Sequence, residues 1–451
     1  MRRATSLSLA VLAALAALAA FSPAVAHASP LDTYGFGSRE TAMGSAMAGD
    51  THAFSASFYN PAGLAMAERL ELSIGYFRVD QHLSIDGNDN GVDPVKGLVG
   101  GLVAPGTLFG VPFAFGLATH LPDDRLSRVR TLKQDVPRWE LYDNRAQILF
   151  IASNIAIRPV PWLSIGGGIG YLSSTRGNLG ITGEAKLRNT YDSQLRHEVD
   201  ADLTSVRIPL FGLRITPNDR ISFGASYRGE AKLDLQLTAD IHGTIDSEIG
   251  VKAPIRYTLT SQSFDAFHPR QITVGTSVVP VDRVRVNLDV VWVNWASYKS
   301  ATSLSTAHLE VGGDVSGVVA LPPDPKPTIV RDPEFKNRLV PHVGVEVSAL
   351  SYAHFELLAR GGYVYERSPV PPQTGPTNFV DADRHTMSLG LGMRVPKPIE
   401  ELPGEVRLDL HGAYSLLPER LVKKESPADF VGDYRARGHQ TNIGATLGVG
   451  F

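Results

Sequence analysis

The sequence of 451 residues contains no cysteine, so no disulfide holds any part of the fold together. Blocks of five or six like charges are absent, and a net charge of −3 gives no electrostatic footprint for nucleic acid. Beyond the N-terminal region, no run of about 18 apolar residues predicts a transmembrane helix. Gly-x-Ser-x-Gly, Walker and His-Glu-x-x-His motifs are missing, so we expect no enzyme, no metal and no other cofactor.

The N-terminus has the three parts of an export signal. "MRR" is basic, "LSLAVLAALAALAAF" is apolar, and "AHA" ending at Ala28 has the small residues of a cleavage site. The alternative is a membrane anchor, but the apolar part is short for a span of about 20 residues. We therefore predict that residues 1–28 are a signal peptide.

From Leu70 onward, apolar and polar residues alternate with a period of two. In "LELSIGY", Leu70, Leu72 and Ile74 share one face, whereas Glu71 and Ser73 share the other. The segments "VRVNLDVVW", "HVGVEVS" and "VRLDLHGAY" repeat this pattern. In an exported chain, such strands predict a transmembrane β-barrel with lipid-facing and lumen-facing side chains.

The connections between these strands alternate in length, which distinguishes a barrel from an antiparallel sandwich. A sandwich would turn every 8–12 residues or so. Here the connections near Pro159, Pro217, Pro280 and Tyr352 are short, and long polar segments lie between them. These long segments are predicted near 120–145, 174–205, 231–270, 299–340, 367–385 and 417–438, and alternation within 231–270 suggests that strands extend beyond the membrane there.

The pattern predicts an all-β fold, a barrel of about fourteen strands over residues 69–451. The strands are expected near 70–79, 98–109, 111–119, 146–157, 162–173, 206–215, 220–230, 271–280, 284–298, 341–350, 355–366, 386–396, 405–416 and 440–451. Because the number of strands is even, the first strand begins and the last strand ends at the same rim, the one with the short turns. The last strand alternates up to Phe451, and an aromatic last residue resembles the signal that the barrel assembly machinery recognises.

A barrel of this size needs something inside it. About eight strands are filled by their own side chains, whereas wider barrels leave an open lumen. The mature N-terminal segment, residues 29–68, is rich in small residues, and we predict that it forms a plug, here called the hatch. Asn60 suits a helix N-cap and Pro61 a first helical residue, with one or two turns over 62–66. Taken alone, "NPAG" would instead be read as an ordinary turn.

Two separated segments resemble one known family. "GFGSRETAMGSAMAGDTHAFSASFYNPAGLA" is similar to the start of mature FadL/TodX-type outer-membrane transporters, and "RGGYVYERSPVPPQTGPTNFVDADRHTMSLGLGMR" resembles their penultimate hairpins. The resemblance implies a monomeric, hatch-plugged barrel among outer-membrane lipids, which imports long-chain fatty acids or other hydrophobic ligands. It also implies hatch movement, with Asn60, Pro61, Ala62 and Gly63 as the gate, and lateral release. A strand kink that would open the wall for this release is expected at Gly100, Gly101, Pro105 and Gly106. The alternative is that these residues mark only a bulge or the rim of the barrel.

Charged residues predicted to face the lumen offer candidate partners for a carboxylate. Alternation directs Arg285, Arg360 and Arg407 inward. The acidic residues Asp289, Glu356 and Asp409 are directed inward too. The alternative to ligand binding is therefore ion pairing across the lumen, and this is the role that we expect for any single arginine.

The segment after residue 119 offers a candidate capture surface. Leu126, Val129, Leu132 and Val136 have helical spacing and would form an apolar surface above the barrel. The alternative is a packed extracellular loop without a ligand.

Two other functions remain open on the sequence alone. A general diffusion porin would normally lack so long a hatch. An outer-membrane lipid hydrolase would need a Ser/His/Asn arrangement across strands, for which 13 histidines are available.

Overall fold

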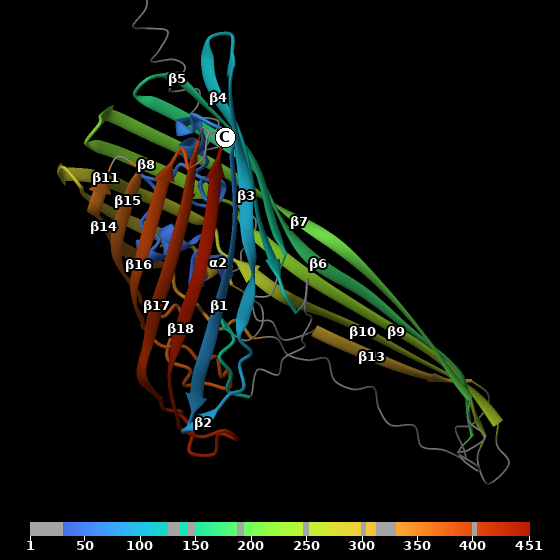
Figure 1. Cartoon of the computed structure of the whole chain (residues 1–451). Helices are drawn as coiled ribbons and strands as arrows, with labels where there is room; N and C mark the ends of the chain where they lie inside the picture. Colours follow the sequence, from blue (N-terminus) through green and yellow to red (C-terminus); the bar gives the residue numbers. More distant parts are fainter. Residues whose placement is uncertain are drawn as a thin grey trace, which may run out of the picture.

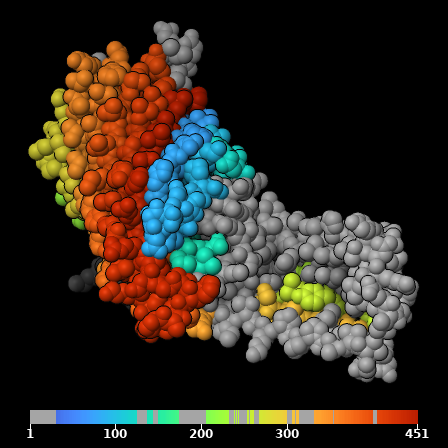
Figure 2. All heavy atoms as spheres, turned by 90° about the horizontal axis from the view of Figure 1, so that it is seen from below, coloured from blue at the N-terminus to red at the C-terminus, as the bar shows by residue number. Residues whose placement is uncertain are grey.

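A computed structural model describes residues 30–124, 136–142, 149–186, 194–246, 252–298, 304–312, 331–352, 354–398 and 404–451. Fourteen strands form a closed antiparallel barrel, in which the first and last strands pair with one another (Figure 1). Seen from below, the blue strands near the N-terminus lie beside the red C-terminal strands (Figure 2). None of the helices in the described ranges is long and apolar enough to cross a membrane.

The fourteen-strand prediction is confirmed, and each predicted strand has a counterpart. The barrel strands are β1 (Glu71–Ile85), β3 (Val95–Leu108), β4 (Val111–Pro122), β5 (Phe150–Val160), β6 (Leu163–Lys186), β7 (Gln194–Asn218), β8 (Ile221–Arg228), β11 (Gln271–Val281), β12 (Val284–Val293), β14 (Arg338–Tyr352), β15 (Phe355–Glu366), β16 (Arg384–Pro396), β17 (Glu405–Val422) and β18 (Tyr434–Gly450). The two-residue strand β2 (Asn88–Asp89) pairs with the end of β1.

Alternation places the side chains as predicted. Leu72 and Ile74 on β1 are 45% and 57% exposed on the outer surface, while Asn287 and Asp289 on β12 are buried on the lumen side. Glu71 at the start of β1 lies opposite Gly450 at the end of β18. Both ends of the barrel therefore lie at one rim, the one with the short turns.

Three further strands and the outer ends of β6 and β7 form an arm that projects obliquely from the other rim (Figure 1). The added strands are β9 (Ala231–Asp246), β10 (Lys252–His268) and β13 (Leu304–Val311). The expectation of strands within 231–270 is confirmed. The expectation of a polar loop over 174–205 is wrong, because β6 runs to Lys186, pairs with β7 throughout, and pairs in parallel with β9 from Leu179 onward.

Two smaller expectations also change. The strand predicted to reach residue 298 ends at Val293, because the chain turns into a short 3-10 helix, η3 (Trp295–Ser297), where the Ser297 hydroxyl donates to the Asn294 carbonyl. Gly100 and Gly101 pair with both β1 and β4 without a shift in register, so they form no bulge. The pairing with β1 ends at Val103, and Pro105 and Gly106 beyond it pair with β4 alone, near the rim.

Candidate functional site

The described part of the hatch lies inside the barrel as a chain of short helices (blue in Figure 1). These are α2 (Pro30–Tyr34), α3 (Ser38–Ala42), α4 (Ala56–Tyr59) and the 3-10 helix η1 (Pro61–Met66). Met43, Met47 and Leu64 are fully buried. Because the segment is rich in small residues, its backbone comes close to the barrel wall.

Asn60 has the capping role expected from the sequence. Its Oδ1 accepts a hydrogen bond from the Ala62 backbone N–H at 3.1 Å, at the start of η1. Its Nδ2 donates to the Ala48 carbonyl at 2.7 Å and to the Leu213 carbonyl on β7 at 3.0 Å. One side chain thus caps η1, links two parts of the hatch and ties the hatch to the wall.

Lumen-facing glycines allow the hatch backbone to contact the wall. A Cβ added at Gly224 on β8 would meet the Ala48 carbonyl, and one at Gly212 on β7 would meet Asn60 and Ala62. Within the described part of the chain, an added Cβ would meet hatch backbone or side chains at these inward glycines: Gly116, Gly166, Gly212, Gly224, Gly344, Gly362 and Gly390. The hatch and the barrel are therefore matched in shape around most of the wall.

We expect Gly224→Val to displace the hatch, because the valine side chain would occupy the place of hatch backbone. Overpacking of this kind costs about 1–3 kcal/mol. The variant should pass more ions than the wild type in planar bilayers. Gly412→Val is the matched control, since a Cβ at that position on β17 would meet nothing within 4 Å. Equal conductance of the two variants would contradict the close contact at Gly224.

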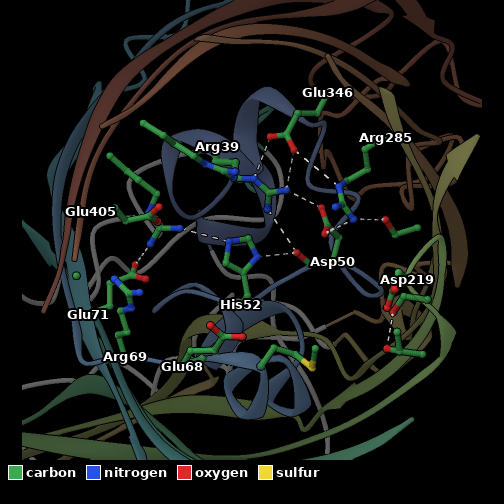
Figure 3. Close-up of a pocket in the computed structure, with 18 of the residues that line it drawn as sticks. Arg39, Asp50, His52, Glu68, Arg69, Glu71, Asp219, Arg285, Glu346 and Glu405 are labelled. Atoms are coloured by element: carbon green, nitrogen blue, oxygen red, sulfur yellow. Dashed lines mark hydrogen bonds and ion pairs between the residues drawn. The ribbon is translucent and has the colours of Figure 1, made fainter. Parts of the chain in front are cut away.

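Buried ion pairs join the hatch to the wall on the side of the short turns (Figure 3). Arg39 on α3 donates from Nη2 to Asp50 Oδ2 at 2.6 Å and from Nε to Glu346 Oε2 on β14 at 3.2 Å. Although burial by itself would raise the pKa of Asp50, the guanidinium groups of Arg39 and Arg285 lower it to about 2. The Asp50 carboxylate therefore stays charged and keeps its partners.

The three arginines predicted to face the lumen all belong to this region. Arg285 donates to Asp50 at 2.8 Å, and Arg360 bridges Glu346 and Asp409 at 2.6 Å each. Arg407 pairs with Glu71 and Glu405, and its Nη1 lies 3.3 Å from Nε2 of the hatch residue His52. Each arginine has a carboxylate partner, as the ion-pairing alternative required.

Two hatch residues have shifted pKa values: Glu40, which is buried, and His52, which is half-buried. Burial, together with the charges of Arg39 and Arg407, holds the pKa of His52 well below its ordinary value, so the imidazole is neutral. Burial raises the pKa of Glu40, although Arg39 opposes this, and its Oε1 accepts a hydrogen bond from the Ser55 hydroxyl at 2.7 Å. His52 therefore adds no charge to the lumen.

On the short-turn side of the hatch, these residues line a polar cavity of about 680 Å³ (Figure 3). Charged side chains of both signs line it, among them Arg39, Asp50, Arg214, Glu346 and Arg407. An apolar molecule in this cavity would separate charged groups from water and from each other, which is costly.

A second, smaller cavity of about 70 Å³ lies between the hatch and strands β8, β11, β12 and β14. Its lining is amphipathic. Leu31, Phe58 and Trp295 provide apolar surface, and Arg228 and Arg338 provide charge. The guanidinium of Arg228 lies 4.0 Å from the centre of the Phe58 ring.

Aromatic side chains cover this second cavity from the side of the long loops. Trp295 and Val340 line the cavity and also belong to a buried cluster that contains Tyr298, Phe335 and Phe379. The rings of Tyr298 and Phe335 stack at 4.4 Å.

On one side the hatch meets the wall through apolar surfaces. Leu64 and Ala65 of the η1 segment pack with Val103 on β3, Ala114 on β4 and Ala156 on β5. Elsewhere, polar bonds tie the hatch to the wall, as between His342 Nδ1 and the Gly44 carbonyl at 2.7 Å, and from Ser388 to the Ala42 carbonyl at 3.1 Å. On the side of Leu64, Asn154 Nδ2 on β5 donates to the Ser57 carbonyl of α4 at 3.2 Å, but the contact around Leu64 itself is apolar.

Of the predicted capture surface, Leu126, Val129 and Leu132 lie outside the described residues. Val136 is exposed, and the chain then turns inward so that Trp139 is fully buried. At the other rim, Phe451 is half exposed and its backbone N–H donates to the Leu70 carbonyl at 2.9 Å. Its role as an assembly signal stays a prediction.

Sequence reasoning missed several residues that the structure brings together. Arg39, Asp50 and Glu346 hold the hatch, and Asp32 pairs with Arg228 at the second cavity. A signal for Arg39 and Asp50 was present, because the segment of small residues contains few charges. For Glu346 and Arg228, alternation gives the direction of the side chain but not its partner.

The closed barrel and the segment filling its lumen define an outer-membrane channel protein with an internal plug. A family model described as outer membrane protein transport protein (OMPP1/FadL/TodX) matches residues 17–402. The chain therefore belongs to this family of outer-membrane transporters of hydrophobic compounds.

Individual relatives agree with this assignment. Alkane uptake protein A of Marinobacter nauticus is 24% identical over 390 residues, which cover 81% of this chain and 79% of the relative. The fold is similar to that of a Pseudomonas aeruginosa FadL homologue, at 17% identity and a TM-score of 0.50, covering 95% of this chain and 99% of the other. It is also similar to the P. putida toluene transporter TodX, at 15% identity and a TM-score of 0.51, covering 93% and 99%.

Proposed function

We propose that the protein imports apolar molecules across the outer membrane by way of the second cavity, and that η1 is the part of the hatch that moves. The observation that carries this proposal is the difference between the two sides of the hatch. Ion pairs and hydrogen bonds hold it to β12, β14 and β16, whereas η1 meets β3–β5 through the apolar packing of Leu64. The hydrogen bond from Asn154 on β5 goes to Ser57 on α4 and not to η1. The names of the relatives, an alkane uptake protein and a toluene transporter, also support an apolar cargo.

The route follows from the cost of moving apolar surface past charges. Cargo in the second cavity is separated from the short-turn rim by the ion pairs of Arg39, Asp50 and Glu346. Passing them would desolvate charged groups without compensation. When Leu64 and Ala65 move, they lose apolar contacts with the wall and gain apolar contacts with the cargo. We therefore propose that the cargo is released toward the wall at β3–β5.

Within η1, the motif residues have distinct parts in this proposed movement. Asn60 is the hinge at the start of η1, because its side chain stays bonded to Ala48 and Leu213. Pro61, Ala62 and Gly63 form the first turn and lie against β6, β7 and the Thr51 carbonyl. Their small side chains allow the turn to move along the wall.

Engineered disulfides test this proposal cleanly, because the natural chain has no cysteine. Leu64→Cys with Gly116→Cys would fix η1 to β4, where a Cβ at Gly116 would touch the Leu64 side chain. Ala42→Cys with Gly390→Cys is the matched control and would fix α3 to β16. Uptake of a radiolabelled alkane is measured in cells before and after reduction.

We expect the oxidised 64–116 pair to lose uptake and to regain it on reduction, while the 42–390 pair keeps uptake in both states. Uptake by both oxidised pairs would contradict a gate at η1. Loss of uptake in both would instead indicate that the hatch moves as a whole.

The two alternative functions predict other results. A diffusion porin would let sugars swell proteoliposomes of the wild-type protein, whereas a plugged barrel should not. A lipid hydrolase would release fatty acid from detergent-solubilised phospholipid, and one serine substitution would abolish this. We expect neither activity.

A further inference from the structure

Arg214 on β7 is a buried cation at the polar cavity on the short-turn side of the hatch. Only 8% of the residue is exposed. Its Nε donates to the Ser222 hydroxyl on β8 at 2.9 Å, and its Nη1 donates to the Thr51 carbonyl of the hatch at 3.0 Å. Neither acceptor carries a charge. Since buried charges are normally paired with an opposite charge, Arg214 differs from the other arginines that hold the hatch.

The carboxylates that line the same cavity do not neutralise Arg214. The buried and half-buried ones pair with other arginines, and they are Asp50, Glu71, Glu346 and Glu405. The two remaining acidic residues, Glu68 and Asp219, are exposed, so the cavity opens to solution at the short-turn rim. Among the described residues that line the cavity, eight are arginine or lysine and six are aspartate or glutamate. The lining therefore has an excess of positive charge.

Hydroxyl groups and a second guanidinium lie beside Arg214. Ser222 and Ser277 are opposite one another where β8 pairs with β11, and both line the cavity. The Ser277 hydroxyl accepts from Arg285 Nη1 at 3.1 Å, as the Ser222 hydroxyl accepts from Arg214. Thr216 Oγ1, 3.4 Å from the Ser222 hydroxyl, adds a third hydroxyl group. Because a hydroxyl that accepts from an arginine can still donate its own proton, this side of the cavity is rich in donors.

We propose that these residues bind a tetrahedral oxyanion of the phosphate class, which enters from solution at the short-turn rim. The anion is the charge partner of Arg214, and it accepts hydrogen bonds from the hydroxyl groups and from the guanidinium groups of Arg214 and Arg285. A tetrahedral oxyanion fits because its four oxygens accept from several donors at once. The site is separate from the proposed cargo route, since the ion pairs of Arg39, Asp50 and Glu346 lie between them.

The bound anion also strengthens the contact between the hatch and the wall. Arg214 and Arg285 bind consecutive residues of the hatch, through the Thr51 carbonyl and the Asp50 carboxylate. Two guanidinium groups at one cavity repel each other. An anion that binds both offsets this repulsion and keeps both arginines on the hatch. A phosphate-class anion on the short-turn side therefore stabilises the plugged state, whatever the cargo is.

The first test is a calorimetric titration of the purified full-length protein with inorganic phosphate and with glycerol 3-phosphate, at constant ionic strength. We expect saturable binding, and the tighter of the two identifies whether the free ion or a phosphate ester is the ligand. In Arg214→Gln the Kd should rise about tenfold or more, because a charge-assisted hydrogen bond is lost. Arg220→Gln is the matched control, since Arg220 lines the same cavity but is exposed and pairs with Asp282 at 2.9 Å. Its Kd should equal that of the wild type.

A second variant keeps every charge in place. Ser222→Ala with Ser277→Ala removes two hydroxyl donors, and the Kd should rise about tenfold. A shift in electrophoretic mobility on heating shows that each variant has assembled. Two results would overturn the site. One is the absence of saturable binding to the wild type, and the other is an equal rise of the Kd in Arg214→Gln and Arg220→Gln, which would reflect only the net charge of the cavity.

Planar bilayers report the effect of the anion on the hatch. Phosphate added on the short-turn side of the wild type should lower the frequency of single-channel openings several-fold, compared with chloride at the same ionic strength. It should have no effect on Arg214→Gln, and none when it is added on the side of the long loops. Equal responses to phosphate and chloride would show that the anion does not stabilise the plugged state.

Discussion

Deletion of residues 29–68 is expected to turn the protein into an open pore. The barrel strands are joined in a closed ladder that includes β1 and β18, so the wall does not depend on the hatch for its hydrogen bonds. A fourteen-strand wall is too wide for its own side chains to fill. Inward residues such as Asn287, Glu346 and Arg360 would become hydrated rather than exposed to lipid. The deletion variant should remain folded and leak small polar solutes.

The measurement is the conductance of the variant in planar bilayers, together with the entry of a large polar antibiotic into cells. The variant retains residues 1–28, the predicted signal peptide, so that its export should be comparable with that of the wild type. A shift in electrophoretic mobility on heating shows that the barrel has assembled. An assembled variant with the conductance of the wild type would falsify the assignment of this segment as the plug.

Substitution of Arg39 by methionine is expected to release the hatch from the wall without removing it. Arg39, Asp50 and Glu346 all have less than a tenth of their side-chain surface exposed. Removing one partner of a buried ion pair leaves uncompensated charge and costs about 3–5 kcal/mol. Arg39→Met should therefore show frequent openings in single-channel recordings and faster proteolysis of the hatch.

A double substitution separates the charge effect from the loss of packing. In Arg39→Met, Asp50 keeps Arg285 and Glu346 keeps Arg360, but the cluster has one negative charge in excess. Adding Asp50→Asn removes that excess charge. We expect the double variant to open less often than Arg39→Met alone, as a double-mutant cycle requires for directly coupled groups. Arg78→Met on the exposed outer face is the control and should behave like the wild type. Additive effects of Arg39→Met and Asp50→Asn would contradict the coupling.

Much of the fold could be predicted because alternation is a local property. Leu72 and Ile74 face lipid, and Asn287 faces the lumen, as their positions in the sequence require. The Asn60 cap was also predictable, since a cap and the turn it starts lie within a few residues. The arm was only partly predictable: alternation within 231–270 indicated strands there, but the parallel pairing of Leu179 with Ala239 joins segments 60 residues apart.

By itself, the sequence determined that this chain forms a lumen-containing barrel, which residues face that lumen, and which segment is available to fill it. These features follow from the two-residue period and from local composition. Only the tertiary structure decided the partners: Arg39 meets Glu346, and Asp32 meets Arg228, across about 200 to 300 residues of chain. The reason is physical, because closing the barrel fixes the register of every strand at once, and only then do the inward charges acquire neighbours.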